Sequence, residues 1–522
     1  MSEARLLMTS PVSRLPQDIL WHTFYFVAQP PKMATRYFSA PSGLHDLRHV
    51  SHVCASWRGL VLASTSLWGM SIELMSLSHS HPRWRNEVLR RTGQSLLDIQ
   101  GYILTDGRES EVLQQFLALL LNKHWPRMRK LDITFNAFER TAGRWHLIKA
   151  MRRAFQKPAP RLEFFSIDLG PSNEFLSGIL RLFADQVPLL STFSAEYFRI
   201  HPQSALLSNL RVLRLTCHWT AHQLLTTLTD IPLLEDLSIR EVEEGNAVEL
   251  SVIEKKTLPR VGLPKLKELE VYMGKALEKY LEVLEHLVLP TRLGVLLECL
   301  RLRSLVQANL LPVQRILASY LHHIFQEELP NYLEIDADKH YILLSLSIGS
   351  DTEFTFKFNF KYETDMTMFL DVITSISLER CTTFNLNTRE GALVPTNTTI
   401  TRTVLPKLTS VNKLYIIARS LQLLPTDGGS VLLPALELLR LDGRHEVEPV
   451  LNFLSTRKTL GVPIQVLDLN RYMSASNGDF RSLESHFVGL KVSWHTYSPG
   501  YMVHEYICGS GNPEVLDFSP KY

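Results

Sequence analysis

Two pairs of histidines in this sequence could in principle bind a metal ion. His79 and His81 stand two residues apart, and His322 and His323 are adjacent, with Glu327 one helical turn further on. Imidazole and carboxylate groups at such spacings can bind zinc, but a zinc site needs three or four ligands and neither group supplies them. Histidines that face solvent or cap helices explain both pairs, so the sequence predicts no metal site.

Candidates for a catalytic nucleophile are also scarce. Cys54 lies between Val50 and Trp57 on an apolar helical stripe, where a thiol packs as a small apolar group. The sequence contains no G-x-S-x-G elbow, no P-loop and no H-E-x-x-H motif, and residues 509–511 (Gly-Ser-Gly) are too few to cradle a phosphate. We therefore expect no enzyme activity, no catalytic residue and no cofactor.

A basic stretch could bind nucleic acid. It comprises Arg83, Arg85, Arg90 and Arg91 beside Trp84, with Arg127, Arg129 and Lys130 downstream. Arginine next to tryptophan suits a single-stranded nucleic acid. The same residues fit a helix flanked by Arg85 and Arg90 whose Trp84 and Leu89 face inward, and the pI of 8.2 is below the values typical of dedicated binders. We favour the helix, so nucleic acid is not an expected partner.

The elements that position these residues belong to an ordinary globular chain. The sequence has 522 residues, of which 45% are apolar and 21% charged, with a net charge of +2, which excludes extensive disorder. The five cysteines are far apart and form no C-x-x-C pair, which argues against a disulfide framework. No segment has the length of apolar residues that a membrane span or a signal peptide needs. We expect a cytoplasmic or nuclear protein that does not contact a membrane.

Two amphipathic helices are predicted near the N-terminus. In residues 14–27 Pro16 suits the first helical position, Asp18 falls in the first turn, and Ile19, Leu20, Phe24 and Val27 share a face. A second helix of about four turns is predicted where apolar residues recur at spacings of 3, 4, 3 and 4, at Leu47, Val50, Cys54, Trp57 and Val61. So few residues cannot bury this much apolar surface, and part of it should face a partner.

These residues closely resemble an F-box. The matching blocks are Leu15-Pro16-x-Asp18-Ile19-Leu20, Val50-Ser51-x-Val53-Cys54-x-x-Trp57-Arg58-x-Leu60 and Leu67-Trp68. The resemblance implies docking on a Skp-type adaptor, and through it on a cullin, with an adaptor-binding surface formed by Leu15, Pro16, Ile19, Leu20, Cys54 and Trp57. Two departures are a long interval between the first two blocks and Ser66 where many relatives have proline.

The rest of the chain is repetitive. Seven of the 27 prolines are followed by the pattern apolar-x-x-apolar-x-apolar, where chance predicts roughly two or three. The pattern follows Pro126, Pro160, Pro188, Pro232, Pro264, Pro434 and, more weakly, Pro330; residues 208–215, 411–416 and 464–469 match without proline. Residues 111–121 and 221–228 have the periodicity of helices that return the chain.

Repeats of this kind resemble degenerate leucine-rich repeats, as found in F-box proteins of mushroom-forming fungi. Each unit would supply one strand and a returning segment, and stacking would bury the apolar sides. Residues 341–360 alternate in hydrophobicity at period two and could be a hairpin insertion or two distorted repeats. We expect an α/β fold: a flexible N-terminus (1–12), an α-helical F-box (13–72) and an irregular leucine-rich-repeat solenoid (73–522).

The combined resemblance implies the substrate-recognition subunit of a Skp/cullin/F-box ubiquitin ligase. Its F-box would dock the adaptor, and its repeats would bind a target protein that the sequence does not identify. The alternative is an interaction scaffold that takes no part in ubiquitination.

Overall fold

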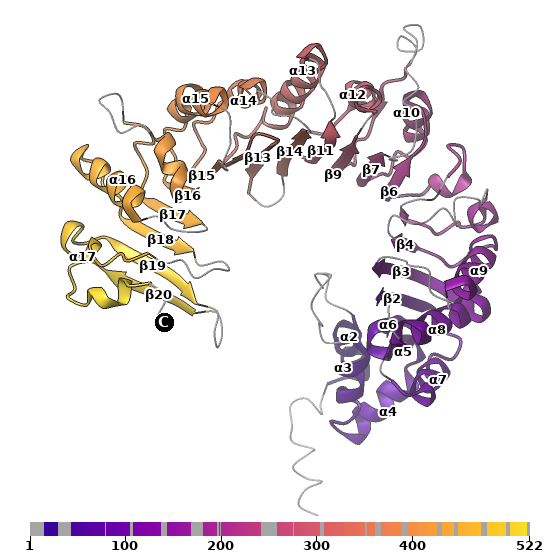
Figure 1. The fold of residues 1–522 in the computed structure, drawn as a ribbon. Helices are drawn as coiled ribbons and strands as arrows, with labels where there is room; N and C mark the ends of the chain where they lie inside the picture. The colour runs from indigo at the N-terminus through magenta and orange to yellow at the C-terminus, as the bar shows by residue number, and fades with distance from the viewer. Residues whose placement is uncertain are drawn as a thin grey trace, which may run out of the picture. The chain divides into compact units, whose positions relative to one another are not determined.

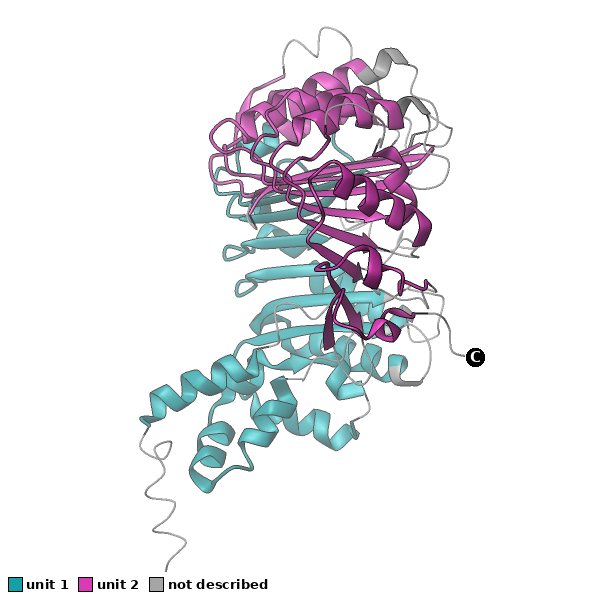
Figure 2. Ribbon diagram, turned by 90° about the vertical axis from the view of Figure 1, so that its left-hand side faces the viewer, with its two compact units in different colours: residues 1–219, 226–242 teal, residues 220–225, 243–522 magenta. Residues whose placement is uncertain are grey.

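A computed structural model describes residues 15–29, 43–78, 80–104, 108–136, 144–168, 181–195, 198, 200–241, 258–274, 276–302, 307–349, 352–360, 367–388, 394–424, 431–442, 447–470, 478–496 and 502–518. Residues 1–12, which we expect to be flexible, lie outside these ranges. The chain divides into two compact units, residues 1–219 with 226–242 (unit 1) and residues 220–225 with 243–522 (unit 2) (Figure 2). No described helix is both long and apolar enough to cross a bilayer.

The described part of unit 1 begins with six helices, at the indigo end of the chain in Figure 1. They are α2 (Gln17–Ala28), α3 (Gly43–Val50), α4 (Ala55–Ala63), α5 (Thr65–Met70), α6 (Leu74–Ser78) and α7 (Pro82–Arg91). Pro16 directly precedes α2 in an extended conformation, one position earlier than predicted. Asp18 lies in the first turn, where its charge favours the positive end of the helix dipole.

The prediction of one helix through residues 47–61 is wrong, because α3 ends at Val50 and α4 begins at Ala55. The Ser51 hydroxyl donates a hydrogen bond to the Arg48 carbonyl at 2.6 Å, a local bond that competes with helix continuation. Cys54 then adopts an extended conformation, with φ −157° and ψ 167°. The apolar spacing runs unchanged through this break, which is why periodicity did not indicate it.

A parallel sheet follows the helices of unit 1. Its strands are β1 (Ile72–Glu73), β2 (Leu97–Leu104), β3 (Met128–Asn136), β4 (Phe164–Asp168), β5 (Thr192–Ala195), β6 (Val212–Cys217) and β7 (Asp236–Glu241). Each pairs in parallel with the next. The chain returns between strands through α8 (Arg108–His124), α9 (Arg144–Phe155), α10 (Ala221–Thr229) and the 3-10 segments η2 (Trp125–Arg127), η3 (Leu182–Asp185) and η4 (Ala205–Leu207). Of α10, residues 226–229 belong to unit 1 and residues 221–225 to unit 2. Strands β3 to β7 and helices α8 and α10 occupy predicted positions.

The core of unit 1 is a row of matching strand positions. Leu131, Phe165, Phe193, Leu213 and Leu237 are direct neighbours on successive strands and are fully buried. The Phe165 ring also lies 5.2 Å from the ring of Phe155 on α9 and 5.1 Å from that of Phe183, between ring centres. The pattern's second apolar position therefore builds the hydrophobic core across the strands.

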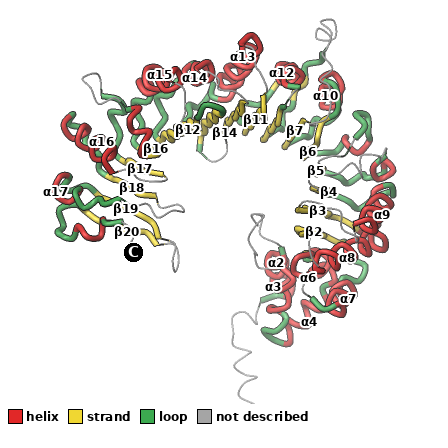
Figure 3. The backbone as a smooth tube through the Cα atoms, in the orientation of Figure 1, coloured by secondary structure: helices red, strands yellow, loops and turns green. Residues whose placement is uncertain are grey.

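Unit 2 contains a larger, mostly parallel sheet. Its strands are β9 (Glu268–Met273), β11 (Gly294–Leu302), β12 (Tyr332–Ala337), β13 (Tyr341–Ile348), β14 (Thr352–Phe360), β15 (Thr383–Thr388), β16 (Lys413–Ile417), β17 (Leu438–Asp442), β18 (Val466–Asn470), β19 (Lys491–Thr496) and β20 (Met502–Ile507). A small parallel pair joins β8 (Val261–Gly262) to β10 (Leu287–Val288). The sheet's helices lie on one side of it (Figure 3): α12 (Leu277–His286), α13 (Gln307–Ile324), α14 (Thr367–Thr374), α15 (Val394–Thr399), α16 (Val447–Thr459) and α17 (Leu483–His486).

Residues 341–360 form a hairpin insertion, the first of the two predicted alternatives. Strand β13 pairs antiparallel with both β12 and β14, while β14 lies parallel to β11 and β12 parallel to β15. The spatial order in this region is therefore β11, β14, β13, β12, β15. Phe354, Phe356 and Phe358 point into the core, where the Phe358 ring lies 4.8 Å from that of Phe369 on α14. The α/β class is confirmed, with a mostly parallel sheet in each unit.

Candidate functional site

Exposed apolar side chains in unit 1 gather on its N-terminal helices. Among the described residues of the unit, six large apolar side chains between positions 15 and 62 are exposed, against two in the remainder, Trp145 and Leu189. The six are Leu15, Ile19, Phe26, Val27, Val53 and Leu62. Apolar surface concentrated in this way marks a region where another molecule can bind.

Helix α2 has one buried and one exposed apolar side. Leu20, Phe24 and Ala28 follow at four-residue steps and are buried. Ile19 and Phe26 are 45% and 70% exposed, and a separation of seven residues, about two helical turns, places them on one side. The four residues predicted to share one face therefore differ in burial: Leu20 and Phe24 belong to the core, whereas Ile19 and Val27 are exposed.

Leu15 and Pro16 lie at the start of α2 and are exposed, Leu15 by 41%. The Pro16 carbonyl accepts the Leu20 N–H at 3.1 Å, which is the first hydrogen bond of the helix. Pro16 has φ −56°, close to the value that its ring imposes, so it enters the helix without strain. Leu15, Pro16 and Ile19 are therefore presented to solvent on ordered backbone.

Cys54 and Trp57 stand where α4 meets α2. Cys54 lies at the N-cap of α4, where its sulfur accepts the Trp57 N–H at 3.5 Å, and it is half-buried. The prediction that it packs on a continuous apolar helical face is wrong, because the helix breaks before it. The Trp57 ring is half-buried and lies 5.0 Å from the Phe24 ring, tilted by 64°. The pair therefore joins α4 to the buried side of α2.

Leu67 and Trp68 of α5 lie where the N-terminal helices meet the sheet of unit 1. Trp68 is fully buried and its ring N–H donates to the Val61 carbonyl at 2.9 Å. The Arg91 guanidinium lies 4.5 Å from the centre of the Trp68 ring and forms an ion pair with Glu87 at 2.9 Å. Gly69 leaves no room for a side chain, because a Cβ there would lie 2.3 Å from the Leu96 carbonyl oxygen.

The basic stretch of residues 83–91 is engaged within the fold. Arg85 is buried and donates to the carbonyls of Leu77 and Ser80. Hydrogen bonds from Arg90, with further ones from Arg91, lower the pKa of Glu87 to about 2. Residues 83–91 therefore lie in a helix, as we expected, and Arg85, Arg90 and Arg91 bond within the protein. Arg85 differs from the prediction because it is buried instead of flanking the helix.

The downstream cations are engaged as well. Arg129 forms a bidentate pair with Asp98, at 2.8 and 2.7 Å. Arg127 donates to the Gly93 carbonyl and the Thr92 hydroxyl, and Lys130 lies 3.2 Å from Asp132. Of the cations in the basic pattern, Arg85, Arg90, Arg91, Arg127, Arg129 and Lys130 each have a partner within the protein, whereas Arg83 is exposed.

The histidines considered as metal ligands also have local roles, except His79, which lies outside the described residues. The His81 ring accepts the Arg83 N–H at 3.2 Å and caps α7. His322 and His323 contact the carbonyls of Ala318 and Leu289 at 2.9 and 2.7 Å. Within the described ranges, no three His, Cys, Asp or Glu side chains converge as metal ligands would.

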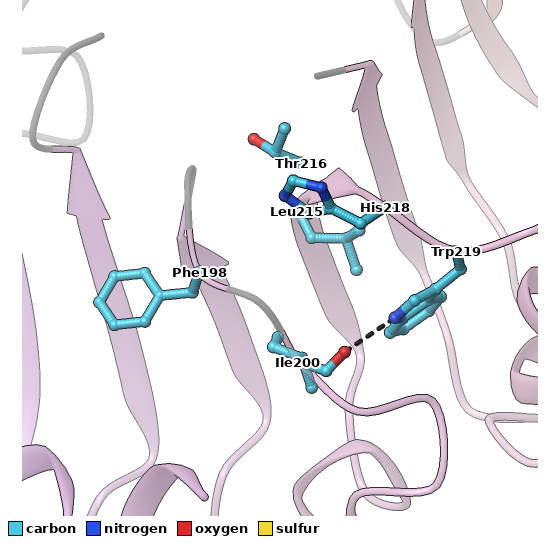
Figure 4. Close-up of a pocket in the computed structure, with 6 residues that line it drawn as sticks. All are labelled: Phe198, Ile200, Leu215, Thr216, His218 and Trp219. Carbon is cyan, nitrogen blue, oxygen red and sulfur yellow. Dashed lines mark hydrogen bonds between the residues drawn. The ribbon is translucent and has the colours of Figure 1, made fainter. Parts of the chain in front are cut away.

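A pocket of about 180 Å³ at the ends of β5 and β6 was not predicted from the sequence. It is lined by Phe198, Ile200, Leu215, Thr216, His218 and Trp219 (Figure 4). The Trp219 ring N–H donates to the Ile200 carbonyl at 2.8 Å, which holds one wall in place. Of the lining residues only His218 is exposed. The pocket can admit a small apolar group.

The sheet face of unit 2 that points away from its helices carries a polar network. Glu334 accepts hydrogen bonds from the Tyr332 hydroxyl at 2.8 Å and the Asn385 amide at 3.0 Å. Burial, followed by the charges of nearby carboxylates including Asp336 and Glu353, raises the pKa of Glu334. These polar side chains therefore bond to one another along the sheet face, and no sequence pattern distinguished them from ordinary solvent-facing strand positions.

Comparison with known proteins adds no assignment, because the chain matches no family model and no curated protein has significant sequence similarity to it. The physical features of the chain therefore carry the functional argument.

Proposed function

We propose that this protein is the substrate-recognition subunit of a Skp/cullin/F-box ubiquitin ligase. The observation that carries the proposal is the exposed apolar side of α2, formed by Leu15, Ile19 and Phe26 on a helix whose opposite side is buried. Burying such side chains on a partner is favourable by roughly 25 cal/mol per Å². The Skp-type adaptor is the partner that the F-box-like blocks imply.

The adaptor-binding surface in this proposal consists of Leu15, Pro16 and Ile19, extended by Phe26 and Val53. Trp57 supports this surface from the buried side of α2, where it packs against Phe24. Leu20 and Cys54 act indirectly: Leu20 packs α2 onto its neighbours, and Cys54 caps α4. The surface needs no rearrangement to bind, because its side chains are already uncovered.

We further propose that the strands of both compact units, with their returning segments, are repeats of the leucine-rich-repeat type. Within each unit, parallel strands in register carry buried apolar rows that run from strand to strand, and these rows support this reading. Such a sheet leaves one face of every strand for a target protein. The chain's contribution to ubiquitination would be positioning, which makes transfer to the bound target effectively intramolecular.

Copurification with the Skp-type adaptor tests the proposal. Full-length wild-type protein is expected to recover adaptor and cullin, and a Leu15→Ala/Ile19→Ala variant is expected to lose both. Because the two side chains are exposed, the variant should keep the wild-type unfolding midpoint. A Leu460→Ala/Val488→Ala variant, which trims exposed apolar side chains of unit 2, serves as the control. Equal adaptor recovery from both variants would contradict the proposal.

An assay of ubiquitination distinguishes a ligase subunit from an interaction scaffold. A complex reconstituted with adaptor, cullin, RING protein and conjugating enzyme should modify proteins that associate with the wild-type chain, and the Leu15→Ala/Ile19→Ala variant should abolish that modification. Modification that persists at the wild-type rate with the variant would favour the scaffold.

A further inference from the structure

The pocket where β5 and β6 end lies beside one buried row of the unit 1 sheet. The direct neighbours in this row, on strands β4 to β7, are Ile167, Ala195, Leu215 and Ile239. Ala195 supplies a single methyl group, whereas Phe193 on the same strand supplies a ring to the adjacent row. This row therefore contributes less volume beside Leu215, which lines the pocket.

The walls of the pocket are held by contacts within the protein. Phe198 is buried, and its ring centre lies 6.1 Å from the ring centres of Phe155 and Phe165 in the core. The Trp219 ring N–H donates to the Ile200 carbonyl at 2.8 Å (Figure 4). Because these walls are already in place, a ligand can enter without first ordering the site, which favours binding.

The lining and size of the pocket indicate what it can hold. Phe198, Ile200, Leu215 and Trp219 give it a buried apolar interior, and the exposed His218 marks its opening to solvent. A cavity of about 150 Å³ holds one benzene ring, whereas sites for whole small-molecule ligands usually measure about 300–1,000 Å³. At about 180 Å³, the pocket matches one side chain of a larger ligand better than a complete small molecule.

We propose that this pocket holds one apolar side chain, of the size of leucine or phenylalanine, from the target protein. The inference rests on the proposed function for the existence of a target, and it adds which kind of side chain the target presents. A side chain that fills a desolvated pocket with fixed walls carries a large share of the affinity at protein interfaces. A charged or amide side chain would lose its hydration in this lining and bind poorly.

Saturation-transfer difference NMR with the full-length protein tests the proposal. The probes are the N-acetyl methylamides of leucine, phenylalanine, asparagine and glycine. The leucine and phenylalanine probes should bind at least about tenfold more tightly than the other two, because burial of such a side chain strengthens binding roughly ten- to hundredfold. Ile200→Trp, which fills the pocket, should abolish this preference. Ile200→Ala, which enlarges the pocket, should shift the preference from leucine toward phenylalanine.

The matched control adds the same indole elsewhere in unit 1. Leu189→Trp changes an exposed apolar position and should keep the wild-type preference. Equal loss of preference in Leu189→Trp and Ile200→Trp would overturn the proposal, as would a wild type that binds all four probes equally. Binding of toluene without any preference among the capped amino acids would assign the pocket to free small molecules and also overturn it.

Two further measurements keep the result interpretable. Circular dichroism melting checks that each variant is folded, and if Ile200→Trp unfolds, an unchanged preference in folded Ile200→Ala overturns the proposal. The Leu15→Ala/Ile19→Ala variant, which should lose the adaptor, should keep the wild-type probe preference. Failure of adaptor binding and failure of the pocket to hold an apolar side chain are therefore distinguishable.

Discussion

Apolar side chains of the N-terminal helices and of the parallel strands have opposite environments. On the strands of unit 1, Phe165 and Phe193 are fully buried between neighbours on both sides. On α2, Ile19 and Phe26 are as apolar and remain exposed. A strand in the middle of a sheet is covered by its neighbouring strands and a returning helix, whereas α2 has cover on one side only. Burial in the sheet therefore supports stability, and exposure on α2 supports binding.

Truncating the sheet core should have the largest effect on stability. Phe165→Ala removes a fully buried ring that packs against Phe155, Phe183 and Phe193. We expect a loss of about 3–5 kcal/mol in the free energy of unfolding, measured by urea denaturation of full-length protein. Leu15→Ala/Ile19→Ala should change the same quantity by less than about 0.5 kcal/mol. Similar losses in both variants would remove the distinction between core and binding surface.

A buried arginine in unit 2 tests whether polar groups also stabilise the packing of that unit's segments. Arg457 of α16 is 4% exposed and donates to the carbonyls of Leu432, Leu433 and Val462. Arg457→Met keeps an apolar stem but leaves these acceptors without a donor, so we expect a loss of about 2–3 kcal/mol. Urea denaturation monitored by tryptophan fluorescence measures it. An unchanged midpoint would mean that water replaces the guanidinium.

A substitution at the N-cap of α4 tests the N-terminal helices, and its expected effect on the free energy of unfolding is smaller. Cys54 caps the helix with a sulfur, which is a weak acceptor. Cys54→Ser supplies a better capping oxygen and should raise the free energy of unfolding by about 0.5 kcal/mol, with adaptor binding retained. Lost adaptor binding in a more stable variant would instead place the Cys54 sulfur in direct contact with the partner.

The smallest effect is expected from pH at Glu334. Burial raises the pKa of this carboxyl in the folded protein, so the folded state binds its proton more readily than the unfolded state does. The stability contributed by Glu334 should therefore fall as pH rises from about 4 through the raised pKa. Urea denaturation of wild type and Glu334→Gln across this pH range isolates the contribution of Glu334 to the free energy of unfolding. The wild type should lose stability relative to the variant as pH rises. A difference that is constant with pH would contradict the raised pKa.

Local patterns in the sequence predicted the strands well. The apolar pattern placed β3, β4, β5, β7, β9, β12 and β17 where proline leads it, and β6, β16 and β18 where proline is missing, because burial on alternate sides of a strand is a local property. The order β11, β14, β13, β12, β15 could not be predicted, since strand pairing joins residues far apart in the chain. The break between α3 and α4 was not predicted either, because the apolar spacing continues through residues 51–54.

The residues expected to form the candidate site differ in exposure. Leu15, Pro16 and Ile19 are exposed, whereas Leu20 lies in the core. Which side of α2 is covered depends on where Trp57 and its neighbours pack, which periodicity does not reveal.

Site-specific photocrosslinking tests the central claim most directly. A photoreactive amino acid at Ile19 of the full-length protein, expressed with its native partners, should give an adduct that contains the Skp-type adaptor. The same group at Leu460, an exposed apolar position of unit 2, should give none. An Ile19 adduct with any other protein, or no adduct while the chain is folded, would contradict the account that the adaptor covers this side of α2.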